Sequence, residues 1–167
     1  LDAIEKRIVS SRYQDFRQGN LDALSGFAVI GHFYNLKHLE KCFRMLHPEF
    51  KMPSDAFISS LFHSTPSFKL HDIKNFTSKT GQTTDGHFIV STFIPEMIEQ
   101  DIWTVFSKVV KACHIAEQYG VGIVSLGGFT SIVGERIGQV IKDHVDIPVT
   151  TGNAFTAAMV IDGIVKA

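Results

Sequence analysis

The chain has 167 residues, of which 44% are hydrophobic and 20% are charged, and this balance excludes a disordered polypeptide. The length is that of one ordinary domain and suffices to bury a hydrophobic core. The 16 basic and 17 acidic residues nearly cancel and form no basic stripe, so we expect no nucleic-acid surface. No apolar run reaches the ~18 residues of a membrane span, and the first residues have no signal-peptide pattern, so we expect a cytoplasmic protein.

The order of the predicted elements is that of an α/β fold. Apolar residues recurring at three- and four-residue steps indicate helices, and short apolar or alternating runs between turn residues indicate strands. In chain order we expect a helix at 1–18, a strand at 27–30, a helix between Asn35 and Pro48, irregular structure with a short helix at 49–68, strands at 70–78 and 87–93, a helix from Pro95 to Gln118, a strand at 121–126, a helix at 131–143, an extended segment at 147–149 and a last helix after 150–153.

Residues 79–86 carry the turn signals of a hairpin, including the dipeptide Asp85-Gly86. One antiparallel hairpin among strands that alternate with helices predicts a mixed sheet with helices on both faces. The last helix ends without a cap and the first residue is not Met, so we expect the chain to be part of a longer protein.

The two cysteines, Cys42 and Cys113, do not form the pattern of a disulfide framework or a zinc site. Each falls on the apolar side of a predicted helix, so we expect two buried thiols, which fits a reducing compartment and makes poor nucleophiles. The eight histidines lack the spacing of metal ligands, and we predict no metal.

The most informative motif is Gly127-Gly128-Phe129-Thr130-Ser131, between a predicted strand and a predicted helix. In open α/β sheets, ligands bind beyond the carboxyl ends of the strands. Glycines there let backbone N–H groups approach an anion or a carbonyl oxygen, and the helix end adds partial positive charge. A tight turn with a hydroxyl cap explains the same residues without a ligand. The glycine spacing is not that of a dinucleotide fingerprint.

A second motif, Thr150-Thr151-Gly152-Asn153, precedes the last predicted helix. It again places hydroxyls, a glycine and an amide at a helix N-terminus, where they can bind a ligand or serve as a plain cap. His32 directly follows the first strand and lies at the edge of the same predicted site.

Five segments of the chain, in the same order, resemble the cyanobacterial long-chain acyl-[acyl-carrier-protein] reductases. They are Phe27–His32, Thr77–Gly81 followed by Gly86, Phe93–Met97, Leu126–Ile132 and Thr150–Asn153. Each segment alone is a weak signal, and the shared order makes the resemblance specific. Ala154 and Phe155 depart from the family, which usually has Thr and His there.

The resemblance implies an enzyme that reduces an acyl thioester to an aldehyde through an acylated cysteine, with NADPH or NADH as the cofactor. That cysteine and the Rossmann domain lie beyond the end of this chain in the family, so the resemblance implies no cofactor site here. It implies a substrate-binding domain at 27–149 and, at 150–167, the start of a linker helix like that of shikimate-dehydrogenase-like enzymes. Residues 1–26 have no counterpart in the family, and their own pattern predicts a helical extension.

The resemblance also implies which residues meet the substrate. Backbone groups of Gly127, Gly128 and Gly152 are expected to orient the reacting carbonyl. The side chains of Ser131, Thr151 and Asn153 are expected to help them, with Phe129, Thr130 and His32 in the same site. The implied partner is an acyl thioester, and both delivery by acyl carrier protein and a homo-oligomer stay open.

Two other functions fit the residues. A stand-alone module that binds an acyl group or another small molecule is favoured by the 14 phenylalanines and by the lack of a complete catalytic set. A structural domain whose glycine turns serve only packing is the third hypothesis.

Overall fold

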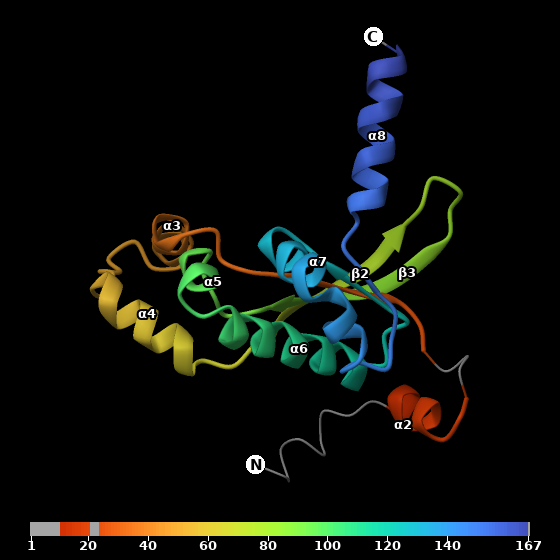
Figure 1. Ribbon diagram of the computed structural model, residues 1–167, viewed down its shortest axis with the longest axis horizontal. Coiled ribbons are helices and arrows are strands. Elements are labelled where there is room, and N and C mark those ends of the chain that lie inside the picture. The colour runs from red at the N-terminus through yellow and green to blue at the C-terminus, as the bar shows by residue number, and fades with distance from the viewer. Residues whose placement is uncertain (1–10, 21–23, 167) are drawn as a thin grey trace.

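The computed structural model describes residues 11–20 and 24–166, and its centre is one five-stranded sheet with helices around it (Figure 1). The elements are α2 (Ser11–Arg17), β1 (Phe27–Gly31), α3 (Leu36–Leu46), α4 (Asp55–Ser64), β2 (Phe68–Thr77), β3 (Thr83–Val90), α5 (Glu96–Gln100), α6 (Ile102–Gln118), β4 (Ile123–Leu126), α7 (Phe129–Lys142), β5 (Val149–Thr150) and α8 (Asn153–Lys166). The strand order is β2-β3-β1-β4-β5. Only β2 and β3 pair in antiparallel fashion among these strands. The predicted α/β fold, with a mixed sheet and one antiparallel hairpin, is confirmed.

β1 lies in the middle of the sheet and sets its register. Ile30 pairs with Ile89 on one side and with Leu126 on the other, and Ser125 pairs with Thr150. Because these four strands are parallel, the residues that follow each of them lie along one edge of the sheet.

One face of the sheet carries the hydrophobic core. Alternate side chains along the strands point to the same face, and the alternate residues that are fully buried are Ala28, Ile30, Ile89, Val124 and Leu126. α6 contacts β1, β2 and β3, and it also contacts α7. The connections β3–α6–β4 and β4–α7–β5 cross the sheet in the same direction, so right-handed crossovers place both helices over this face. Each fully buried Ile, Val or Leu side chain contributes about 1.5–3 kcal/mol there.

On the opposite face, aromatic rings lie across glycines of the neighbouring strand. A Cβ on Gly86 would stand 2.6 Å from Cζ of Phe27, and a Cβ on Gly31 would stand 2.6 Å from Cζ of Phe88. Phe27 also meets Phe76 edge-on, with ring centroids 5.6 Å apart. Phe76 is 58% exposed, so this face is less completely covered than the core face.

The hairpin turn is shorter than predicted and covers 78–82. The dipeptide Asp85-Gly86, predicted in the turn, lies within β3. Asp85 accepts the backbone N–H of Asn75 at 3.0 Å, where the backbone has a positive φ of 53° beside a register shift of β2. The prediction that Asp85-Gly86 lies in the turn is therefore wrong. Asp85 bonds the backbone N–H of an irregular part of β2, and Gly86 leaves room for the ring of Phe27.

Other element boundaries also differ from the prediction. The long helix expected from Pro95 is interrupted at Asp101, whose side chain accepts the N–H of Thr104 and caps the start of α6. The second hairpin strand ends at Val90. α2 covers part of the predicted first helix, and residues 1–10 lie outside the described residues. No helix in the described part of the chain is long and apolar enough to cross a membrane.

We predict that Gly86→Ala lowers the free energy of unfolding by about 1–3 kcal/mol, the usual cost of overpacking. The new Cβ would occupy the space of the Phe27 ring, which is held on the central strand. Urea unfolding monitored by circular dichroism measures the change. The matched control is Gly163→Ala in α8, where no atom lies within 4 Å of the new Cβ. The control should be neutral or slightly stabilising, and equal effects in the two variants would refute the packing argument.

Candidate functional site

The three segments predicted to form a ligand site lie along one edge of the sheet. His32 follows β1, the run 127–131 follows β4 and the run 151–153 follows β5. The N–H of Gly127 donates to the carbonyl of Ile30 at 2.8 Å, which extends the pairing of β1 and β4 beyond the strands. The sequence placed these residues at strand ends, and the strand order makes those ends neighbours.

Both ring nitrogens of His32 are bonded inside the protein. Nδ1 lies 2.8 Å from the carbonyl oxygen of Phe33, and the N–H of Phe129 donates to Nε2 at 2.9 Å. Because Nε2 accepts, the proton of the neutral ring must sit on Nδ1 and point to that carbonyl. The ring stacks on Phe93 with centroids 4.8 Å apart. Burial lowers the pKa of His32 below its ordinary value of 6.5, and the bond to Phe33 partly offsets this, so the ring is neutral at neutral pH.

The turn after β4 packs directly on this histidine. Gly128 has a positive φ of 58°, and a Cβ there would lie 2.8 Å from Nε2 of His32. A side chain at this position would clash with the ring and strain the backbone. Glycine at 128 is therefore required for the close approach of the two segments.

The hydroxyl groups of the motif serve the turn itself. Oγ of Ser131 donates to the carbonyl of Gly128 at 2.6 Å, and Oγ1 of Thr130 donates to the carbonyl of Gly127 at 2.6 Å. Thr130 is fully buried, whereas Phe129 is partly exposed. An incoming carbonyl oxygen would have to compete with these internal bonds for the hydroxyl hydrogens.

The segment before α8 is more open. Oγ1 of Thr150 accepts the N–H of Gly152 at 3.2 Å, and the N–H of Asn153 points to Oγ1 of Thr151 at 3.5 Å. Gly152 has a positive φ of 73°, and no atom lies within 4 Å of the place where its Cβ would be. This backbone is thus both the local cap of α8 and accessible from outside.

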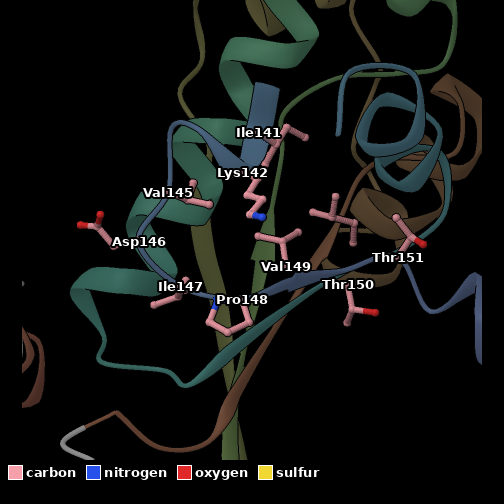
Figure 2. Close-up of a pocket in the computed structure, with 10 residues that line it drawn as sticks. Ile141, Lys142, Val145, Asp146, Ile147, Pro148, Val149, Thr150 and Thr151 are labelled. Atoms are coloured by element: carbon pink, nitrogen blue, oxygen red, sulfur yellow. The ribbon is translucent and has the colours of Figure 1, made fainter. Parts of the chain in front are cut away.

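A cavity of about 720 Å³ lies between β5 and the end of α7 (Figure 2), a volume typical of small-molecule sites. Its lining residues are Leu126, Ile141, Lys142, Val145, Asp146, Ile147, Pro148, Val149, Thr150 and Thr151. The lining combines residues of both strand ends with the loop before β5. In Figure 2 the ammonium group of Lys142 is directed toward Val149, and the carboxylate of Asp146 points outward. Sequence patterns did not single out this loop, because it has no motif.

The loop beside the cavity is anchored by Glu117, a buried carboxylate on α6. Oε1 accepts the N–H of Asp146 at 2.6 Å, and Oε2 lies 2.8 Å from Nδ1 of His114. The side chain of Glu117 is 2% exposed. In the sequence, Glu117 stands out only as a carboxylate within the apolar stripe of a helix. Its bonding partner, the N–H of Asp146, cannot be inferred from spacing.

Lys108, a second buried polar side chain of α6, fixes the segment that carries Phe93, the ring on which His32 stacks. Nζ of Lys108 donates to the carbonyl of Thr65 at 2.6 Å and to Oγ1 of Thr92 at 3.3 Å. Burial lowers the pKa of Lys108, and the charge of Lys111 adds to this effect. The bond to Thr92 fixes the backbone directly before Phe93 and so helps to hold the ring on which the imidazole stacks.

The two thiols differ, which corrects the prediction that both are buried. Cys113 is fully buried, and burial, with the nearby charge of Glu117, raises its pKa to about 12. Cys42 is only half-buried, because it lies beside the apolar stripe of α3 and not within it. Among the described residues, no group of three or more His, Cys, Asp or Glu side chains could hold a metal ion.

Glu117→Leu should lower the free energy of unfolding by about 1–3 kcal/mol, since the N–H of Asp146 loses its acceptor. Hydrogen exchange at the Asp146 amide should become faster in the same variant. Glu117→Gln keeps an acceptor oxygen and serves as the matched control, with a smaller loss. An unchanged exchange rate in Glu117→Leu would show that the carboxylate does not anchor the loop.

For the cysteines we expect a thiol reagent at mildly alkaline pH to modify Cys42 in the native chain and to reach Cys113 only after unfolding. The reason is the burial and the high pKa of the second thiol. The number of modified thiols, counted with and without denaturant, shows whether Cys113 is protected in the native chain. The control is the Cys42→Ser variant. Rapid native modification of the Cys42→Ser variant would contradict the burial of Cys113.

The strand order and the parallel pairing place the chain in the class of open α/β domains. In such domains, ligands bind beyond the carboxyl ends of the strands. No family model matches the chain. Over 143 residues it is 32% identical to the long-chain acyl-[acyl-carrier-protein] reductase of Synechococcus elongatus. The matched region covers 80% of this chain and 40% of that protein. Over 80 residues it is 35% identical to the aminotransferase PigE of a Serratia species, covering 48% of this chain and 9% of that protein.

The resemblance to the long-chain acyl-[acyl-carrier-protein] reductases, predicted from five short segments, is therefore confirmed over most of the chain. The chain spans less than half the length of the curated relatives that it matches.

Proposed function

We propose that this chain is the substrate-side domain of a reductase that converts an acyl thioester, carried by acyl carrier protein or coenzyme A, into an aldehyde. The observation that carries the proposal is the 32% identity to the reductase over 143 residues. The proposed domain comprises residues 27–149, with an extension at 1–26 and the start of a linker at 150–167. On its own, the chain would be inactive.

The proposed electron donor is NADPH or NADH, bound by another domain of the full-length protein. The described glycine turn at the sheet edge does not fit a dinucleotide. The glycine turn after β4 lacks the fingerprint spacing, and the N–H of Phe129 is already bonded to His32.

The residues at the sheet edge would bind the thioester and orient its carbonyl. α7 and α8 both start at this edge, and their N-terminal ends carry partial positive charge that favours an oxygen gaining negative charge. We assign the backbone of Gly127, Gly128 and Gly152 to this role, with the side chains of Ser131, Thr151 and Asn153. The open backbone at Gly152 offers the least obstructed approach.

The exposed surface of α8 supports a second domain. The helix projects away from the sheet (Figure 1), and none of its described side chains is buried. Its large exposed apolar residues are Phe155, Met159, Val160, Ile161, Ile164 and Val165. An apolar surface of this kind marks an interaction site, and in the proposed enzyme α8 would pack against the nucleotide-binding domain.

The cavity beside β5 favours one alternative, a module that binds an acyl group or another small molecule without hydride transfer. Its apolar lining includes Leu126, Ile141 and Val149, and Thr151 lies at the candidate site. The internal hydrogen bonds of Thr130 and Ser131 are also expected under the third hypothesis, a structural domain whose glycine turns serve only packing.

The test is aldehyde formation by the full-length protein with acyl thioesters and NADPH. In that assay Thr151→Val should lower kcat/KM by about 10²-fold, the usual effect of removing a donor to a developing oxyanion. Thr80→Val in the exposed hairpin turn is the matched control and should behave as wild type. Tight binding of acyl groups without aldehyde formation would favour the binding module instead.

A further inference from the structure

His32 joins two segments that lie 97 positions apart, and it does so with both ring nitrogens. Nδ1 is committed to the carbonyl of Phe33 and Nε2 to the N–H of Phe129. A histidine that contacted the substrate would need a nitrogen free to do so. The geometry therefore separates His32 from the other predicted site residues.

We propose that His32 is a positioning residue whose neutral ring holds the turn 127–129 in shape by accepting the N–H of Phe129, and that protonation of the ring releases this turn. The proposal rests on the proposed function, because the turn matters to catalysis only if it belongs to the substrate site. It adds the regulation of that site by pH.

The packing around the ring leaves it one arrangement. The imidazole stacks on Phe93 at 4.8 Å with an interplanar angle of 18°, and the Phe129 ring meets it edge-on at 5.4 Å. On the third side, the place of a Cβ on Gly128 is 2.8 Å from Nε2. A ring rotated by half a turn about its Cβ–Cγ bond would put the carbon Cε1 in the place of Nε2 and lose the acceptor that faces Phe129.

The surroundings of the ring favour its neutral form. Tyr34 touches it edge-on at 5.7 Å, and His38 of α3 contacts Tyr34 at 5.5 Å. The remaining described contacts, with Phe93, Phe129 and the carbonyl of Phe33, carry no charge. In the described part of the chain, the ring nitrogens bond to a backbone carbonyl and a backbone N–H and to no carboxylate, so no negative charge compensates a buried imidazolium there.

Protonation would place an N–H on Nε2, facing the N–H of Phe129, and the two donors would repel each other. Burial lowers the pKa of His32 in the folded chain below 6.5. The neutral ring therefore stabilises the fold fully above pH 6.5, the ordinary value, and this contribution is lost as the pH falls through the lower folded-state pKa.

The experiment compares His32→Phe with His32→Gln in the full-length protein. Phe keeps a ring on Phe93 but has no acceptor, whereas the amide oxygen of Gln can reach the place of Nε2 and accept the N–H of Phe129. We measure the protection factor of the Phe129 amide by hydrogen exchange, together with kcat, KM and the pH profile of aldehyde formation.

In His32→Phe, the protection of Phe129 and kcat should each fall about tenfold, the effect of losing one hydrogen bond of ordinary strength. His32→Gln should keep both values near wild type and should lose the decline of activity on the acidic side. In the wild-type protein, the protection of Phe129 should fall as the pH decreases below 6.5.

An equal loss of kcat in both variants, with the protection of Phe129 unchanged, would overturn the proposal and assign His32 to direct contact with the substrate. Protection that does not change with pH in the wild-type protein would also overturn it, and this measurement needs no variant to fold. A wild-type protein that makes no aldehyde would count against the proposed function, while the exchange data would still decide whether His32 holds the turn.

Discussion

The register of β1 between β3 and β4 is the constraint on which the candidate site depends. Ile30 pairs with Leu126, and the carbonyl of Ile30 then accepts the N–H of Gly127 just beyond the strand. A shift by one residue would turn every core side chain of β1 to the opposite face. It would also move His32 away from the turn after β4, so the core and the site share one register.

Close packing at the sheet edge makes the site rigid and consumes much of its polar chemistry. The hydroxyl groups of Thr130 and Ser131 and the N–H of Phe129 are bonded inside the turn. In the proposed enzyme, such a turn would need little reorganisation on meeting the substrate, which is an advantage in catalysis. The accessible backbone lies instead at Gly152, so the two predicted motifs differ physically: the turn after β4 is bonded internally, and the backbone before α8 is open.

Buried polar anchors connect this edge to the rest of the domain. Glu117 holds the loop beside the cavity through the N–H of Asp146, and Lys108 holds the segment before Phe93. Both side chains belong to α6, the helix that covers the core face of the sheet. This helix thus packs in the hydrophobic core and also anchors two segments beside the candidate site.

The sequence by itself determined the class of fold, the order of the elements, the cap of α3 at Asn35 and the position of both glycine motifs at strand ends. These features depend on local periodicity and on the chemistry of turns, which a short segment contains completely. The resemblance to the reductases likewise came from short segments in a shared order. Only the tertiary structure decided that both nitrogens of His32 are bonded, that Asp85 serves a strand irregularity and that Cys42 is half-buried. Each of these depends on which distant segment lies opposite the residue, and the packing of the sheet, not the local pattern, sets that distance.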